Sequence, residues 1–83
     1  MKIEVWGAQD GRCPQCNTLK KFLDSKFTTY GFMCVDKYPE TRKELGIKNI
    51  PVMILRDDDG TELERVVGFN ENTRHKVLEI ISK

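Results

Sequence analysis

The sequence predicts a single α/β domain whose elements follow the order βαβαββα. Short runs of β-branched and aromatic residues alternate with segments in which apolar residues recur every three or four positions, the pattern of strands connected through helices. The length of 83 residues is enough for one modest core and too short for a second domain. No linker, internal repeat or low-complexity segment divides residues 1–83, so we expect one domain.

The composition is that of an ordinary soluble globular chain, with 39% hydrophobic residues, 33% charged residues and a net charge of +1. This balance gives no reason to expect a nucleic acid or an anionic membrane surface as a partner. Lys2 and Glu4 interrupt the amino-terminal apolar run, and no segment reaches the roughly 18 apolar residues of a membrane span. We therefore expect a cytoplasmic monomer.

The first half of the chain predicts a strand, a helix and a second strand. Residues 2–6 and 31–36 are rich in β-branched and aromatic residues and are the predicted strands. Between them, Pro14 suits the first turn of a helix over residues 14–26, because that position needs no intrahelical N–H bond. A strand, helix, strand crossover predicts a parallel pair with a right-handed connection. One stripe of the helix is expected to face the core, and it contains Cys16, Leu19, Phe22, Leu23 and Phe27.

The second half predicts a short helix followed by a hairpin. Pro39 begins the short helix, and Gly46 is a favoured residue just past its end. Asp59-Gly60 lies between two apolar-rich runs and is typical of a hairpin turn, so the flanking strands should be antiparallel. The predicted ranges are 40–45 for the helix and 52–56 and 62–67 for the strands.

The final helix begins with Asn70 or Asn72 as its cap. Val77, Leu78 and Ile81 are predicted to lie on the face that packs against the core. His75 is expected on the solvated face of the same helix.

The three cysteines carry the chemical signal of the sequence. An odd number of cysteines without a signal peptide argues against a secreted disulfide framework, whereas a cytosolic CxxC pair is typical of redox or metal chemistry. Cys13 falls at or just before the helix start and Cys16 one turn inside, a spacing that suits a small dithiol ring. The helix N-terminus and Arg12 favour a thiolate at Cys13, and burial in the apolar stripe favours a neutral thiol at Cys16. Cys13 is therefore the predicted nucleophile and Cys16 the resolving thiol.

Two other interpretations of the pair remain open at this point. A structural zinc site usually needs four ligands, and the only further candidates are Cys34 and His75. Two inert buried thiols are the second alternative. Cys34 itself, alone in a predicted strand, is expected to act as a small hydrophobic residue of the core.

Three motifs resemble the glutaredoxin and thioredoxin superfamily, and the resemblance covers essentially the whole chain. They are CPQC after the first strand, IPV at residues 50–52 and VGF at residues 67–69. The resemblance implies the thioredoxin fold, a four-stranded mixed sheet flanked by three helices. It also implies a cis peptide bond before Pro51 that places the Ile50 backbone beside the dithiol. An extended substrate segment would pair with that backbone and present its disulfide to Cys13.

Within the superfamily, part of the sequence resembles glutaredoxins and part resembles thioredoxin. The length and the CPxC pattern resemble small and phage-encoded glutaredoxins, whereas residues 35–69 resemble thioredoxin. CPQC differs from both the glutaredoxin CPYC and the thioredoxin CGPC. Gly68-Phe69-Asn70 replaces the Gly-Gly and acidic pair that help glutaredoxins hold glutathione, and this Gly-Phe is similar to the small redoxins that reduce ribonucleotide reductase.

The resemblance implies a thiol-disulfide oxidoreductase that reduces protein disulfides, ribonucleotide reductase among the candidates, and needs no tightly bound cofactor or metal. A thioredoxin-reductase-type flavoenzyme is the expected electron donor, and a glutathione-dependent glutaredoxin is the alternative. An adaptor module that uses the CxxC pair for metal binding or redox sensing is an alternative of another class. Glu4 resembles the buried acid of thioredoxin that assists proton transfer at the resolving cysteine. The expected substrate-binding residues are Arg12, Pro14, Gln15, Ile50, Pro51, Gly68 and Phe69, with Gln15, Ile50, Pro51 and Phe69 forming a neutral-to-apolar rim around Cys13.

Overall fold

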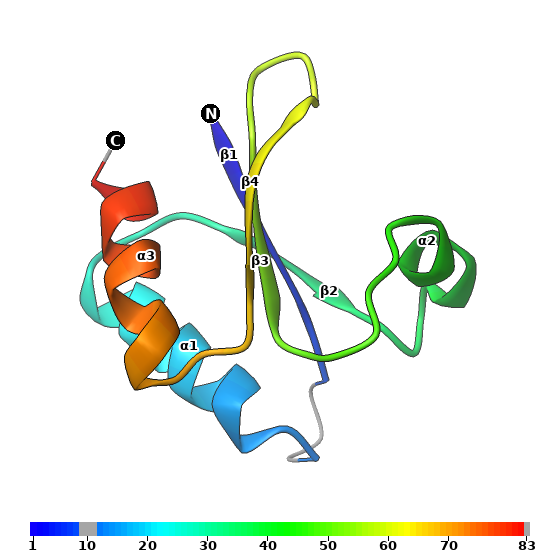
Figure 1. The fold of residues 1–83 in the computed structure, drawn as a ribbon, viewed down its shortest axis with the longest axis horizontal. Coiled ribbons are helices and arrows are strands. Elements are labelled where there is room, and N and C mark those ends of the chain that lie inside the picture. The colour runs from blue at the N-terminus through cyan, green and yellow to red at the C-terminus, as the bar shows by residue number, and fades with distance from the viewer. Residues whose placement is uncertain (9–11, 83) are drawn as a thin grey trace.

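The computed structural model describes residues 1–8 and 12–82, and within them a mixed sheet of four strands has the order β2-β1-β3-β4 (Figure 1). β1 pairs in parallel with β2 and antiparallel with β3, and β4 pairs antiparallel with β3. The strands are β1 (Lys2–Gly7), β2 (Gly31–Cys34), β3 (Val52–Arg56) and β4 (Glu62–Val67). The predicted order βαβαββα and the mixed sheet are therefore confirmed.

The second strand is shorter than predicted. β2 ends at Cys34, although the apolar pattern predicted a strand to residue 36. The Val35 N–H still donates to the Gly7 carbonyl, but the Lys37 N–H turns back to the Cys34 carbonyl and closes a turn. Asp36 therefore stands outside the sheet, where its carboxylate is free to meet a partner from another segment.

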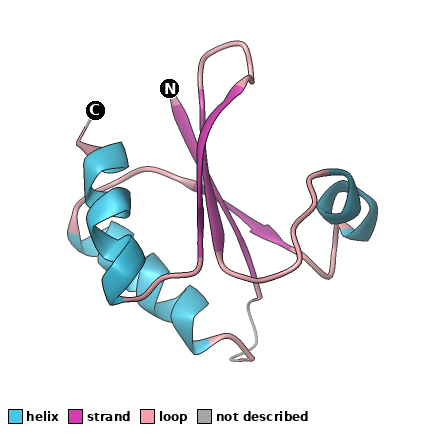
Figure 2. Cartoon of the chain, in the orientation of Figure 1, coloured by secondary structure: helices cyan, strands magenta, loops and turns pink. Residues whose placement is uncertain are grey.

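Two helices cover one face of the sheet and a short helix lies on the other side (Figure 2). α1 (Pro14–Ser25) and α3 (Glu71–Ile81) share the first face, and α2 (Pro39–Glu44) belongs to the second. The core under α1 and α3 contains Val5, Leu19, Leu23, Met53, Leu55, Val66, Phe69, Val77 and Ile80. The core on the α2 face contains Trp6, Val35, Ile47, Val52 and Ile54. Neighbouring residues of β1 and β3 thus alternate between two cores, as the pleat of a strand requires.

The end of α1 differs from the predicted apolar stripe. Phe27 was expected in the core, but its φ is 55° and its side chain is 96% exposed. The Phe27 N–H donates to the Asp24 carbonyl and the Thr28 N–H to the Leu23 carbonyl, which is a Schellman motif with Phe27 in the left-handed position. Because the chain reverses there, periodicity no longer applies at Phe27, and the prediction for this residue is wrong. The other stripe residues face the core: Cys16, Leu19 and Leu23 are buried and Phe22 packs against them.

α3 is capped by Asn70, one of the two predicted caps. Its side-chain oxygen accepts the N–H groups of Asn72 and Thr73 at 2.8 and 3.2 Å, and the Thr73 hydroxyl accepts the Asn70 N–H. Val77 and Ile80 are buried and Ile81 packs beside them, whereas the predicted core residue Leu78 is 36% exposed. The buried stripe follows the spacing i, i+3, i+4, and Leu78 lies one position around the helix from it.

The segment between α2 and β3 contains a cis peptide bond between Ile50 and Pro51, as the family resemblance implied. Among the described residues, no helix is long and apolar enough to cross a membrane.

Candidate active site

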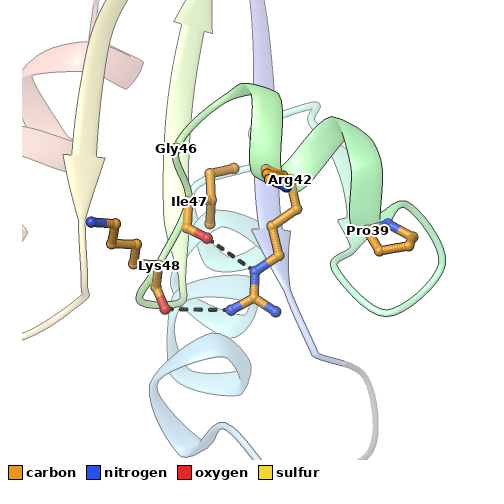
Figure 3. Close-up of a pocket in the computed structure, with 6 residues that line it drawn as sticks. Pro39, Arg42, Gly46, Ile47 and Lys48 are labelled. Atoms are coloured by element: carbon orange, nitrogen blue, oxygen red, sulfur yellow. Dashed lines mark hydrogen bonds between the residues drawn. The ribbon is translucent and has the colours of Figure 1, made fainter.

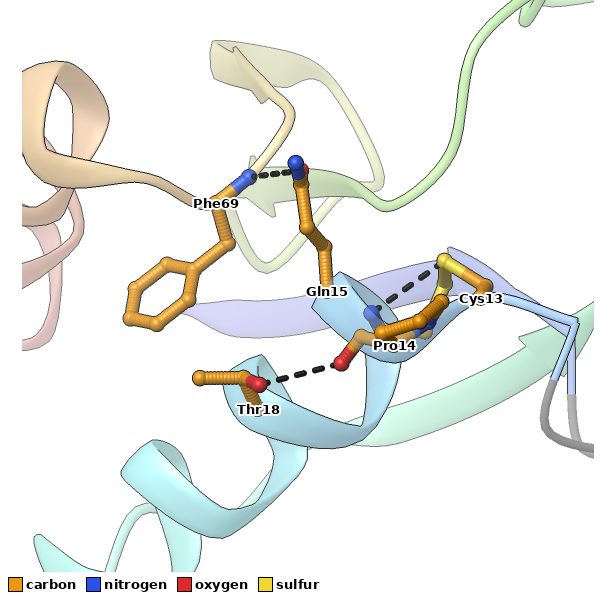
Figure 4. Close-up of a disulfide and its surroundings, with 6 residues drawn as sticks. Cys13, Pro14, Gln15, Thr18 and Phe69 are labelled. Carbon is orange, nitrogen blue, oxygen red and sulfur yellow. Dashed lines mark hydrogen bonds between the residues drawn. A yellow bond between two sulfur atoms is a disulfide. The ribbon is translucent and has the colours of Figure 1, made fainter.

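The two cysteines of the CPQC motif lie at the start of α1, where the structure holds them as a disulfide (Figure 4). Cys13 is the N-cap residue and its sulfur accepts the Cys16 backbone N–H at 3.2 Å. Pro14 occupies the first turn, where no intrahelical N–H bond is lost. Cys13 keeps 7% of its surface exposed and Cys16 none. Both cysteines are therefore buried, and Cys13 is the one that keeps some contact with solvent.

β1 approaches the dithiol closely because it ends in a glycine. A Cβ atom at Gly7 would lie 2.8 Å from the Cys16 sulfur, closer than such atoms approach in real structures. Ala8 and Ile50 complete the contacts around the two cysteines. Gly7 and Ala8 were not among the predicted site residues, although a glycine inside a strand is a known signal of close approach.

The chain around the cis bond lies next to this cluster. Ile50 is partly buried against Cys13 and Cys16, and Pro51 is fully buried. The Gly68 N–H donates to the Pro51 carbonyl at 2.7 Å, which joins the end of β4 to the start of β3. Gly68 has a φ of +80°, a conformation that favours glycine. The structure therefore brings Ile50, Pro51 and Gly68 to the dithiol end of the sheet.

Gln15 connects the CPQC motif to the start of α3. Its side-chain oxygen accepts the Phe69 backbone N–H at 3.1 Å (Figure 4). The Phe69 ring is 7% exposed and packs on Phe22 with ring centroids 5.3 Å apart. The expectation that Phe69 and Pro51 present their side chains in an apolar rim is therefore wrong, because both side chains are buried. Pro14 and Gln15 are exposed between the two cysteines, and Val67 is 50% exposed at the end of β4.

Arg12, the residue before Cys13, forms an ion pair with Asp36 in the turn after β2. The two side chains are 60% and 48% exposed. The positive charge expected beside Cys13 is therefore shared with a carboxylate, in water of high dielectric constant. Asp36 was not singled out in the sequence, because its position next to Arg12 depends on the turn that ends β2.

Comparison with known proteins establishes the family. No family model matches the chain. It is 30% identical over 66 residues to the SPbeta prophage-derived thioredoxin-like protein YosR of Bacillus subtilis, a match that covers 80% of this chain and 82% of that protein. The chain belongs to the thioredoxin-like proteins.

Solved structures agree with this thioredoxin-like assignment at the level of the fold. NrdH-redoxin of Escherichia coli matches with a TM-score of 0.70 and 24% identity over 93% of this chain and 95% of that one. Glutaredoxin of Archaeoglobus fulgidus gives 0.68 and 21% over 99% and 87%. Plasmodium falciparum thioredoxin gives 0.73 and 17% over 94% and 82%. The protein is thus a thioredoxin-like redox protein with a CxxC dithiol on the thioredoxin fold.

Glu4 of this thioredoxin-like protein lies on the α2 face of the sheet. Its carboxylate accepts the Trp6 indole N–H at 2.7 Å and pairs with Arg56 at 3.4 Å. Trp6 belongs to the core on the α2 face. Gly7, the next residue along β1, faces the opposite side of the sheet, and the Cys16 sulfur lies close to it there. These contacts favour a structural role for Glu4 and give no direct route for the expected proton transfer to Cys16.

The third cysteine and the histidine of this thioredoxin-like protein lie outside the cluster formed by Ala8, Cys13, Cys16 and Ile50. Cys34 is a free, buried cysteine in register with Gly7 on the neighbouring strand. His75 is exposed on α3. Within residues 1–8 and 12–82, no three histidine, cysteine or acidic side chains gather in a group that could hold a metal ion.

Proposed function

We propose that the protein reduces disulfides in protein substrates as a dithiol electron donor. The Cys13 thiolate attacks one substrate sulfur, which forms a mixed disulfide and expels the other substrate sulfur as a thiolate. Cys16 then loses its proton and attacks the Cys13 sulfur, which releases the second substrate thiolate and leaves the Cys13–Cys16 disulfide. The observation that carries the proposal is the position of the two cysteines at a helix start, where Cys13 keeps 7% of its surface exposed and Cys16 none, because attack by Cys13 needs access to the substrate.

The backbone of Ile50 is the proposed docking edge for the substrate. Among the described residues, no hydrogen bond uses the Ile50 N–H or carbonyl group, although Ile50 packs directly on the dithiol. An extended substrate segment would satisfy these groups as an added strand would, with its disulfide above Cys13. Pro14, Gln15, Gly68 and the half-exposed Val67 would contact its side chains.

A pair of serine variants tests the assignment of roles. Cys13→Ser should abolish the reduction of insulin disulfides, because the attacking sulfur is lost. Cys16→Ser should instead accumulate a mixed disulfide, which mass spectrometry detects as a covalent adduct. Cys34→Ser is the matched control and should keep its turnover within about twofold, since Cys34 is buried outside the dithiol cluster. Turnover at the wild-type rate in both active-site variants would overturn the proposal.

We propose a thioredoxin-reductase-type flavoenzyme as the electron donor in preference to glutathione. A glutathione carboxylate would need free N–H donors near the start of α3. Here four of the N–H groups in residues 69–73 are already bonded: the Phe69 N–H to Gln15, the Asn70 N–H to Thr73, and the Asn72 and Thr73 N–H groups to the Asn70 side chain. E. coli NrdH-redoxin is described as glutaredoxin-like with a thioredoxin-like activity profile, and we extend that profile to this chain. Ribonucleotide reductase is a candidate substrate because Gly68-Phe69 resembles the small redoxins that reduce it.

The donor is decided by NADPH consumption with insulin, driven in parallel by thioredoxin reductase and by glutathione with glutathione reductase. We expect faster turnover with the flavoenzyme. Gln15→Ala frees the Phe69 N–H and should raise the glutathione-driven rate, whereas Asn17→Ala, an exposed residue of the same helix, should not. Faster turnover with glutathione in the wild type, lost in Arg12→Ala, would make the protein a glutaredoxin instead. Stoichiometric metal in the purified protein, without reversible oxidation of two thiols, would instead indicate an adaptor module.

A further inference from the structure

A basic hollow lies on the α2 side of the molecule, outside the dithiol cluster. It has a volume of about 400 Å³ and is lined by Pro39, Arg42, Lys43, Gly46, Ile47 and Lys48 (Figure 3). Three of these six residues are cationic and none is acidic. We call this surface the basic groove.

The cations of the basic groove have no acidic partner among the described residues. Arg42 donates from Nε to the Ile47 carbonyl at 3.0 Å and from Nη2 to the Lys48 carbonyl at 3.3 Å. These two bonds hold the guanidinium group in place without neutralising its charge (Figure 3). Lys43 and Lys48 are exposed, and no ion pair within residues 1–8 and 12–82 involves them. The groove therefore contains one guanidinium group that is held in place and two flexible ammonium groups beside it.

The cations of α2 line the groove and its two glutamates do not. Pro39, Arg42 and Lys43 follow the spacing i, i+3, i+4 and line the groove, whereas Glu40 and Glu44 are four residues apart and do not. Glu40 lies three residues before Lys43, yet no ion pair joins the two among the described residues. The whole chain has a net charge of only +1, so the groove is a local feature of this face.

Arg42 also connects the basic groove to the dithiol. It lines a second hollow of about 210 Å³ together with Ala8, Arg12, Val35, Asp36 and Ile50. Ala8 and Ile50 of that hollow pack directly on Cys13 and Cys16. Its single acidic residue, Asp36, is already paired with Arg12. A continuous surface therefore runs from the dithiol past Ile50 to Arg42 and on to the two lysines.

We propose that the basic groove binds an acidic, extended segment next to the disulfide of the protein substrate. This inference rests on the proposed function and adds the class of substrate to it. A segment paired along Ile50 reaches Arg42 first, whose planar guanidinium suits a carboxylate, and then the exposed ammonium groups of Lys43 and Lys48. Acidic side chains of the substrate thus speed its encounter with Cys13 and hold it in register.

The test uses the full chain, reduced beforehand, and two synthetic disulfide peptides that are identical except that flanking glutamates in one are glutamines in the other. Second-order rate constants of peptide reduction are measured by acid quench and chromatography, so no electron donor is needed. We expect the acidic peptide to be reduced about tenfold faster at about 20 mM salt, and the advantage to shrink at about 300 mM salt.

Two variants of equal charge locate the effect. Lys43→Gln/Lys48→Gln should lose most of the preference for the acidic peptide while reducing the neutral peptide at the wild-type rate. Lys21→Gln/Lys76→Gln removes the same charge from exposed positions on α1 and α3 and should keep the preference. Circular dichroism checks that both variants are folded.

The outcomes separate this inference from the proposed function. Equal rates for the two peptides, or an equal loss of preference in both double variants, would overturn the role of the groove while disulfide reduction stands. Tighter binding of a single-stranded oligonucleotide than of the acidic peptide would overturn it in favour of a nucleic acid. Failure of the wild-type protein to reduce either peptide would contradict the proposed function itself.

Discussion

The two cysteines of the dithiol have identical side chains but differ in how tightly the surrounding residues pack on them. Cys13 retains 7% exposure as the N-cap residue, and Cys16, one turn later, has none. Gly7 makes that burial possible, because its missing side chain leaves room for the Cys16 sulfur against β1. Burial disfavours a charge on the Cys16 sulfur, which supports the proposed first attack by Cys13.

Gly7→Ala should therefore disturb the dithiol directly. The added Cβ would lie 2.8 Å from the Cys16 sulfur and 3.3 Å from its Cβ, so α1 or β1 must shift. We expect a loss of about 1–3 kcal/mol in the free energy of unfolding of the oxidised protein, as for other overpacked cores. The loss should be smaller in the reduced protein, where the sulfur is free to rotate, which shifts the equilibrium toward the dithiol.

Urea unfolding of both redox forms measures these losses. Gly31→Ala is the matched control, because nothing lies within 4 Å of a Cβ at Gly31, and it should change stability by about 0.5 kcal/mol or less. Equal losses for the two glycine variants would show that close approach to Cys16 is not the reason for Gly7.

At the scale of elements, the ends of the two long helices are determined by different local chemistry. α1 ends in a Schellman motif with an aromatic residue in the left-handed position, where glycine is usual. α3 begins with a capping box, which satisfies the N–H groups of Asn70, Asn72 and Thr73 internally. The cap of α3 therefore serves both the helix and the proposed exclusion of glutathione.

Asn70→Ala should weaken α3 and open its N-terminus together. Loss of the two bonds accepted by the Asn70 side chain should cost about 1 kcal/mol, which corresponds to a melting temperature lower by roughly 4–8 °C. Asn72→Ala is the control in the same turn. The backbone N–H of Asn72 donates to the Asn70 side chain, but the Asn72 side chain makes no hydrogen bond among the described residues. Thermal unfolding compares the two variants, and equal melting temperatures would contradict the role of the cap.

Across the whole molecule, the features that sequence could predict are those that repeat along the chain. Runs of β-branched and aromatic residues and the apolar stripes of α1 and α3 predicted the order of elements, and the CPQC spacing predicted the dithiol. Phe27 was misassigned because periodicity does not indicate where a helix ends. Leu78 was misassigned because periodicity does not indicate how wide the buried stripe is. The pairing of Arg12 with Asp36 joins residues 24 positions apart and depends on the folded sheet.

The response of the molecule to acid follows from the carboxylates of the β3–β4 hairpin. Hydrogen bonds with Asp57 and Thr61 lower the pKa of Asp59 to about 2, and the hydrogen bond from Arg65 lowers the pKa of Glu62. A bond from the amino terminus likewise lowers the pKa of Asp58, which attaches the hairpin to the start of β1. For a carboxylate whose pKa is lower in the folded state, the stabilisation is complete above the unfolded pKa of about 4 and is lost as the pH falls.

We therefore expect the melting temperature to be flat near neutral pH and to fall from about pH 4 toward pH 2, as these carboxylates become protonated. The decrease should be several degrees at most, because the three groups are largely exposed and water screens their interactions. Glu62→Gln removes one of the titrating groups and should make the acid decrease shallower, with a lower melting temperature at pH 7 than the wild type. Glu71→Gln, an exposed residue in the first turn of α3, is the control and should keep the wild-type slope. A profile that stays flat down to pH 2 would show that bonds within the hairpin do not stabilise the fold.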